Sequence, residues 1–104
     1  MRVIWQTPAK VGRDNVADYI RDYFGAKHRI RFLQEVRHTT KMLRRSPNLG
    51  SIDPLFADRP VAYRSIIING LSKMVYRIDE DVIHIVAFWD TRREPEALAA
   101  QVKE

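Results

Sequence analysis

The amino-acid sequence predicts an α+β fold: an N-terminal strand, an antiparallel helix hairpin, a three-stranded antiparallel meander that completes one sheet, and a short C-terminal helix. Apolar residues recur every three or four positions up to residue 45, which is the period of an amphipathic helix. Beyond residue 62 they form strand-like runs instead, two of which flank an Asn-Gly turn. With 104 residues, of which 45% are hydrophobic, the chain has the size and composition of one domain, residues 1–104.

The first strand is expected at Arg2–Gln6, and it ends where Thr7 and Pro8 begin a helix. Thr7 is a suitable N-cap, and Pro8 fits the first helical position because its missing N–H would have no partner there. This helix is expected to run to Phe24, with Gly25 as the residue that ends it. The apolar stripe that should face the core is formed by Val11, Val16, Tyr19, Ile20, Tyr23 and Phe24.

A second helix is expected over residues 26–45, and Ser46-Pro47-Asn48 ends it. Because only a short break separates the two helices, they should form an antiparallel hairpin. The exposed face of the second helix should carry Lys27, Arg31, Arg37, Lys41, Arg44 and Arg45. Such a face either keeps a protein soluble or binds an acidic partner, and both interpretations stay open. Residues 46–62 contain three prolines and are expected to form an ordered loop.

The second half of the chain predicts the meander. Tyr63–Ile68 and Leu71–Ile78 flank Asn69-Gly70, a pair that tolerates the positive φ angles of a two-residue type I′ turn. Val82–Trp89 is almost continuously apolar, which suits a strand buried on both faces. The Ala-rich segment 94–104 should form a short terminal helix that begins near Pro95.

A two-residue turn at Asn69-Gly70 would fix the pairing of the two strands. Ile66 would then face Lys73, Arg64 would face Val75, and Ala62 would face Arg77. The face opposite the helices would carry Arg64, Ile66, Lys73 and Arg77. The face towards the helices would carry Tyr63, Ser65, Ile67, Met74, Tyr76 and Ile78.

The end of the last long strand predicts a second group of candidate contacts, because Trp89, Arg92 and Arg93 follow one another closely. Guanidinium groups bind phosphates and carboxylates in a bidentate manner, so this group could hold either. The alternative is an ion pair between Asp90 and one of the arginines, with Trp89 in the core.

Composition excludes several classes of protein. Lysine and arginine number 18 against 13 acidic residues, and the absence of cysteine rules out disulfides, thiolate zinc sites and thiol nucleophiles. The chain contains no glycine-rich phosphate loop, Gly-x-Ser-x-Gly or His-Glu-x-x-His motif, which argues against cofactor enzymes, metalloenzymes and serine hydrolases. No metal site and no cofactor are expected. Without a membrane-spanning or signal segment, a soluble cytoplasmic protein is expected.

Several short segments, in this order and spacing, resemble the RelE/ParE toxin superfamily over roughly residues 2–95. They are Thr-Pro-Ala-Lys at 7–10, Val-Ala-Asp-Tyr-Ile at 16–20, Ser-Pro-Asn-Leu-Gly at 46–50, Tyr-Arg at 63–64, Lys-Met-Val-Tyr-Arg-Ile at 73–78, Val-Ile-His-Ile-Val at 82–86 and Trp-Asp-Thr-Arg-Arg at 89–93. The resemblance implies the toxin of a bacterial type II toxin–antitoxin system, neutralised by a cognate antitoxin that wraps a segment over its surface. Higher-order toxin–antitoxin complexes are also implied, and no membrane partner is.

Two branches of this superfamily differ in their target. RelE-like members cleave mRNA in the ribosome with a group of basic residues and often a tyrosine. ParE-like members, which include plasmid stabilisation proteins, inhibit DNA gyrase and lack that site. Arg64, Lys73 and Arg92 match basic positions of the ribonuclease site, but Ile66 occupies another and the tyrosine position falls near Leu98. The resemblance therefore favours the ParE-like, non-enzymatic branch.

Two alternatives remain at this stage. One is a RelE-like endoribonuclease that acts on ribosome-bound mRNA with Arg64, Lys73, Arg77 and Arg92. The other is a degenerate, non-toxic member that only binds the antitoxin. In every case the resemblance and the predicted faces assign target or antitoxin contacts to Arg64, Ile66, Lys73, Arg77, Trp89, Arg92 and Arg93.

Overall fold

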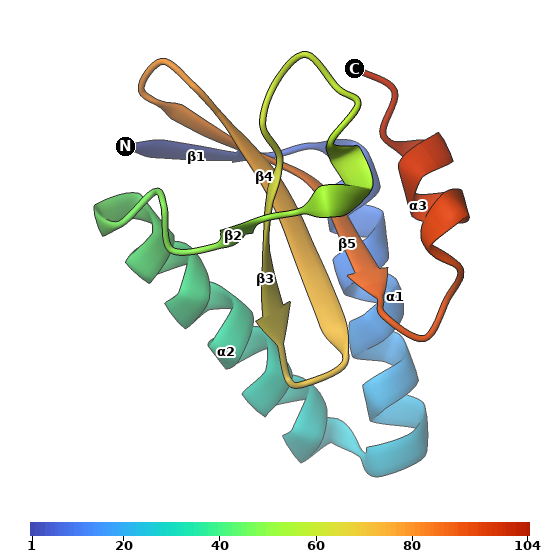
Figure 1. The fold of residues 1–104 in the computed structure, drawn as a ribbon. Helices are drawn as coiled ribbons and strands as arrows, with labels where there is room; N and C mark the ends of the chain where they lie inside the picture. Colours follow the sequence, from blue (N-terminus) through green and yellow to red (C-terminus); the bar gives the residue numbers. More distant parts are fainter.

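A computed structural model describes all residues 1–104, and a five-stranded sheet with helices on both faces forms its framework (Figure 1). Its elements, in chain order, are β1 (Arg2–Trp5), α1 (Thr7–Phe24), α2 (Ala26–Arg45), β2 (Ser51–Ile52), the 3₁₀ helix η1 (Pro54–Phe56), β3 (Arg64–Ile68), β4 (Ser72–Asp79), β5 (Val82–Asp90) and α3 (Pro95–Gln101). The predicted fold class is confirmed. Within 46–62, however, β2 and η1 form short elements where the sequence predicts only a loop. No helix has both the length and the apolar character needed to span a bilayer.

The strand β5 is an interior strand of the sheet, between β1 and β4, in the order β1-β5-β4-β3-β2. It pairs in parallel with β1, from Arg2 opposite Val82 to Trp5 opposite Ile85, and antiparallel with β4. Both faces of β5 are covered, and Ile85 is completely buried. This position explains the continuous apolar run that predicts the strand.

The helix hairpin packs on one face of the sheet, here called the helical face. The bounds of α2 are those predicted, but Thr7 is the first residue of α1 rather than its N-cap: Gln6 holds that position without a side-chain bond. Gly25 has φ 99° and alone separates the two helices. That positive φ favours glycine, so this residue allows the sharp reversal between α1 and α2.

The turn between β3 and β4 has three residues, and the predicted register is wrong. Ile68 pairs with Ser72 and Arg64 with Tyr76, while Leu71 is left in the loop. Asn69 and Gly70 do have positive φ angles, as predicted. The additional residue is held by the segment that follows β5, because the Leu71 carbonyl accepts bonds from the Thr91 N–H (2.8 Å) and hydroxyl (2.9 Å).

One extra loop residue exchanges the two faces of β3 relative to β4. Arg64 and Ile66 therefore lie on the helical face, on the same side as Tyr76, whereas Lys73 and Arg77 lie on the opposite face. The prediction that these three cations share a face with Ile66 is wrong. The assignment of Met74, Tyr76 and Ile78 to the helical face is confirmed.

A bulge in β5 decides which face of the sheet each of its last two aromatic residues takes. Val75 pairs with Ala87 and Tyr76 with Ile85, so Val86 has no partner. Beyond the bulge, Phe88 packs in the core under the helices, and Trp89 packs on the opposite face. The second core consists of Phe56, Tyr63, Val75, Val86, Ala87, Trp89, Leu98 and Val102.

The opposite face of the sheet is covered by η1 and α3. An ion pair attaches η1 to the sheet, and contacts of the C-terminal segment attach α3. Lys73 Nζ lies 2.8 Å from Asp53 Oδ2, with the two side chains 19% and 5% exposed. Burial alone would raise the pKa of Asp53, but the bonds from Lys73 and from the Leu55 N–H outweigh it, and this pKa lies below its ordinary value. The ion pair thus holds the start of η1 against the sheet.

The C-terminal segment is attached to the rest of the fold by side-chain hydrogen bonds and an ion pair. Arg77 binds Glu104 through Nη2 (2.7 Å) and Nε (2.9 Å), and Gln6 contacts the same carboxylate. Arg59 donates to the carbonyl of Ala99 (2.6 Å) at the end of α3. Burial would raise the pKa of Glu104, yet Arg77 lowers it below its ordinary value. Gln6, which follows β1, and Arg77 of β4 are therefore both bound to the C-terminal residue of the chain.

Gly12 allows α1 to lie directly against β5, because a Cβ at this position would lie 2.2 Å from the Phe88 carbonyl oxygen. We expect Gly12→Ala to lower the free energy of unfolding by about 1 to 3 kcal/mol through overpacking. Alanine ordinarily stabilises a helix relative to glycine, so a decrease in the free energy of unfolding would indicate the close contact with β5. Urea denaturation measures it, with Asn15→Ala on the exposed side of α1 as a control that should not destabilise. A more stable Gly12→Ala variant would contradict the close approach.

Removal of Lys73 would leave the Asp53 carboxylate buried without its partner. We expect Lys73→Met to cost about 3 to 5 kcal/mol at pH 7, and Lys73→Met with Asp53→Asn to recover part of the loss.

The sign of the pH dependence follows from the lowered pKa of Asp53. In the wild type its contribution is present above the unfolded pKa of about 3.9 and is lost as the pH falls through the lower folded value. In Lys73→Met the lowering effect of Lys73 on the pKa of Asp53 is lost while burial and the Leu55 N–H bond remain, so this pKa rises relative to the wild type and the variant should be less impaired at pH 3 than at pH 7. Denaturant titrations at both pH values check this, and an equal deficit at both would contradict it.

Candidate functional site

The candidate cations from the sequence do not form one cluster. Arg64, on the helical face, donates from Nη1 to the Gly50 carbonyl at 2.7 Å. Lys73 and Arg77 point to the opposite face, four residues apart along β4, a distance of about 13 Å. Each of these two is already bound to a carboxylate, as described above. Ile66 is half-buried and packs on the helical core.

Arg92 lies beyond the end of β5, on the side of α1. Its guanidinium binds Asp90 in a bidentate manner, with Nη2–Oδ2 at 2.7 Å and Nε–Oδ1 at 3.0 Å, and lies 5.6 Å from the centre of the Tyr19 ring. The bond from Arg92 holds the pKa of Asp90 below its ordinary value, and Asp90 with Tyr19 raises the pKa of Arg92. The ion pair between Asp90 and an arginine, which the sequence predicts as one of two alternatives, is therefore present.

Trp89 is a core residue, only 6% exposed, in the group of side chains under α3. Arg93 covers it, with the guanidinium carbon 4.0 Å from the ring centre. No carboxylate lies within ion-pair distance of Arg93. This arginine therefore has no ion-pair partner in the chain, and it acts on Asp90 only at longer range.

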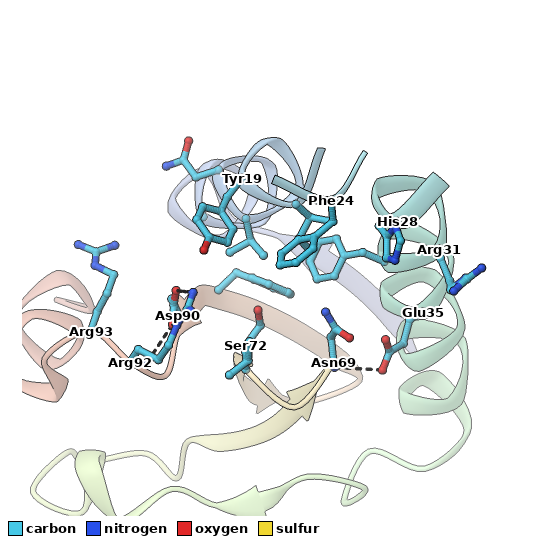
Figure 2. A pocket seen from close by; sticks show the side chains of 17 residues that line it. Tyr19, Phe24, His28, Arg31, Glu35, Asn69, Ser72, Asp90, Arg92 and Arg93 are labelled. Carbon is cyan, nitrogen blue, oxygen red and sulfur yellow. Dashed lines mark hydrogen bonds and ion pairs between the residues drawn. The ribbon is translucent and has the colours of Figure 1, made fainter. Parts of the chain in front are cut away.

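A groove opens where the helix hairpin leaves the sheet uncovered (Figure 2). Its main cavity has a volume of about 550 Å³ and lies between α1, α2, the β3–β4 turn and the end of β5. The lining residues are Gly12, Asn15, Val16, Tyr19, Ile20, Phe24, His28, Arg31, Phe32, Glu35, Asn69, Leu71, Ser72, Phe88, Asp90, Arg92 and Arg93. Figure 2 shows Arg93 and Arg31 at opposite ends of this cavity.

The lining combines exposed apolar groups with positive charge. Phe24 is 60% exposed and Leu71 46% exposed, although both are large and apolar. The two carboxylates are engaged: Asp90 by Arg92, and Glu35 by the Asn69 N–H at 3.1 Å. Arg31 and Arg93 have no carboxylate partner, so the groove has a net positive rim around an apolar floor.

A second cavity of about 290 Å³ extends the groove towards α3. It shares Gly12, Asn15, Phe88 and Arg93 with the first. Together the two cavities follow one stripe of α1 from its first turn to its last. Because 18 helical residues span about 27 Å, the groove can hold several turns of a helix or an extended segment of comparable length.

The sequence did not predict this groove. Val11, Tyr19, Tyr23 and Phe24 were expected to face the core, but all four are exposed. The sequence does contain a signal for the groove, because the apolar stripe of α1 is wider than the surface that the core covers. The core buries only Ala9, Ala17 and Ile20 of this helix. Asp90, Arg92 and Arg93 were singled out correctly as neighbours, whereas their position beside α1 depends on the tertiary fold. No group of three histidine, aspartate or glutamate side chains is placed to hold a metal ion.

Comparison with known proteins agrees with this architecture. The family described as "ParE toxin of type II toxin-antitoxin system, parDE" matches residues 3–95. A solved structure described as "Chromosomal ParDE TA system from P. aeruginosa" superposes with a TM-score of 0.70 at 19% sequence identity, over 86% of this chain and 95% of that one. No curated protein sequence matches the chain.

The structural likeness, at this low identity, supports the fold, and the family match extends over nearly the whole chain. The resemblance to the RelE/ParE superfamily in the sequence is thereby confirmed. The chain belongs to the ParE toxin family of type II toxin–antitoxin systems.

Proposed function

We propose that the protein is a growth-inhibiting toxin that a cognate antitoxin neutralises by placing a segment in the groove along α1. The observation that carries the proposal is the groove itself, where exposed apolar side chains lie beside two unpaired arginines in a chain of the ParE family. A monomer gains nothing by leaving Phe24 and Leu71 in water, whereas a partner that covers them buries apolar surface.

The chemistry of the groove defines the antitoxin segment. Apolar side chains would contact Tyr19, Phe24 and Leu71, and acidic side chains would meet Arg31 and Arg93. Charge-assisted bonds to arginine are strong and directional, so they would fix the register of the segment. An amphipathic segment with an acidic edge has these properties.

We propose DNA gyrase as the target, as in the ParE-like branch. Ribonuclease chemistry on a phosphodiester needs cations aimed at one developing charge, and Arg64, Lys73 and Arg77 instead point to two faces and hold parts of the fold. This dispersal supports a protein that acts by binding. Gyrase is a cytoplasmic enzyme, so the expected cytoplasmic location goes with the proposal.

The groove can be tested by co-purification with the product of the neighbouring reading frame. We expect Leu71→Glu to abolish the complex, because it places a charge on the apolar floor. Ile67→Glu is the matched control: Ile67 is 54% exposed and lies on the opposite face of the sheet, so its complex should persist. Loss of binding in Ile67→Glu but not in Leu71→Glu would place the antitoxin elsewhere.

The target can be tested with purified protein and with induced cells. We expect micromolar protein to inhibit DNA supercoiling by gyrase, and primer extension on translated mRNA to show no new cleavage ends after induction. Cleavage ends that disappear in Arg92→Ala would instead support the RelE-like endoribonuclease. Normal growth on induction without the neighbouring gene, with unaffected gyrase, would support a non-toxic antitoxin-binding protein.

A further inference from the structure

The outer surface of α2 carries a row of cations that no contact of the fold explains, and only Arg31 among them also lines the groove. A helix advances about 100° per residue, so positions 27, 31, 34, 38, 41 and 45 form one straight stripe opposite the buried residues Phe32, Val36 and Leu43. The stripe contains Lys27, Arg31, Gln34, His38, Lys41 and Arg45, and Arg37 and Arg44 lie along one side of it. All six lysines and arginines among them are exposed.

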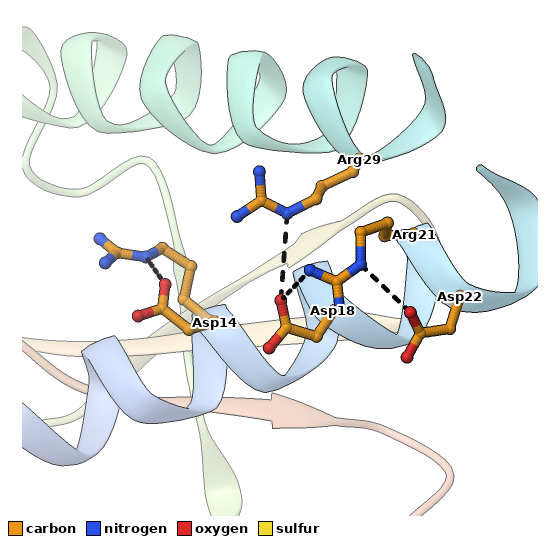
Figure 3. Close-up of polar contacts among 6 residues, drawn as sticks. Asp14, Asp18, Arg21, Asp22 and Arg29 are labelled. Carbon is orange, nitrogen blue, oxygen red and sulfur yellow. Dashed lines mark hydrogen bonds and ion pairs between the residues drawn. The ribbon is translucent and has the colours of Figure 1, made fainter. Parts of the chain in front are cut away.

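These cations are unpaired, in contrast to the arginines of α1. Figure 3 shows that α1 neutralises its own charges: Arg21 binds Asp18 (3.4 Å) and Asp22 (3.1 Å), and Arg29 from the inner side of α2 approaches Asp18 at 4.0 Å. No ion pair in the structure includes Lys27, Arg31, Arg37, Lys41, Arg44 or Arg45. The helix contains one acidic residue, Glu35, which bonds the β3–β4 turn instead.

Stability does not account for the stripe. Like charges four residues apart, such as Lys27 with Arg31 and Lys41 with Arg45, destabilise a helix by about 0.2 to 0.5 kcal/mol for each pair. Only Arg44 and Arg45 lie in the last turn, where a cation interacts favourably with the helix dipole. Solubility would be served equally by mixed charges, which α1 has.

The composition of the stripe identifies the partner. Protein interfaces are built around apolar or aromatic anchors, and single-stranded nucleic acids are bound by stacking on aromatic rings. The stripe has no large apolar side chain, and Ile30 (55% exposed) is the one exposed apolar residue between its cations and Arg37. A row of lysine and arginine about 27 Å long, with so little apolar surface, matches the phosphate backbone of a duplex.

We propose that the outer face of α2 binds the phosphates of double-helical DNA without reading its sequence. The major groove of B-form DNA is about 12 Å wide and admits a helix, whereas that of A-form RNA is too narrow. The cations of α2 cover a sector of about 140° from Arg44 to Arg31, so a helix seated in the groove would present charge to phosphates on both sides. Gln34 and His38 are the only other side chains on the stripe, which leaves little for base recognition.

Fluorescence anisotropy with a 20-base-pair duplex of arbitrary sequence tests the proposal. If five cations engage phosphates, the logarithm of the binding constant should fall with the logarithm of the salt concentration with a slope of about −4.5. The charge-neutralised variant Lys41→Gln with Arg45→Gln should reduce the slope by about 2 units and weaken binding roughly 50-fold at 0.1 M salt. Both positions lie outside the groove along α1.

The matched control removes the same charge elsewhere. Lys10 and Lys103 are exposed and unpaired, and Lys10→Gln with Lys103→Gln changes the net charge equally. This control should retain the slope and affinity of the wild type. Thermal denaturation should show both double variants folded, since neither removes a contact.

Three outcomes would overturn the proposal. Equal weakening in the two double variants would mean that net charge, and not α2, attracts DNA. Competition by polyglutamate as effective as that by DNA would indicate an acidic protein partner. Preference for duplex RNA or for single-stranded DNA at the same salt concentration would exclude the B-form geometry.

Discussion

The strand β5 must bury both of its faces, and the rest of the structure follows from this requirement. Its position between β1 and β4 needs one covering layer on each side. The helix hairpin supplies the first layer, and η1 with α3 supplies the second. The bulge at Val86 serves both layers, because it gives Phe88 to the first and Trp89 to the second. The polar end of the same strand then emerges beside α1, where Asp90 and Arg92 complete the groove.

The groove and the cation stripe, which share Arg31, both contain arginines without an ion-pair partner in the chain. Several other charged residues are engaged: Lys73 binds Asp53, Arg77 binds Glu104, and Arg21 of α1 binds aspartates of the same helix. The apolar floor of the groove and the mainly cationic character of the stripe differ in chemistry, and each suits a different kind of partner.

Most elements could be predicted from the sequence because their signals are local. The period of α2, the apolar run of β5 and the glycine between the helices each lie within a few residues. The register of β3 could not be predicted, since it depends on one loop residue, Leu71, whose carbonyl is bound by Thr91, 20 residues away. For the same reason the faces of Arg64 and Ile66 were assigned wrongly, and the Lys73–Asp53 pair was not foreseen: each depends on contacts between distant segments.

The parallel pairing of β1 with β5 has a consequence for synthesis. Arg2 pairs with Val82, so β1 has no strand partner until about four fifths of the chain has been made. The helices can form early from local contacts, whereas the sheet waits for β5. The groove along α1 also needs Asp90, Arg92 and Arg93, which leave the ribosome among the last residues. Any molecule that fits this groove therefore meets a finished protein and not a nascent one.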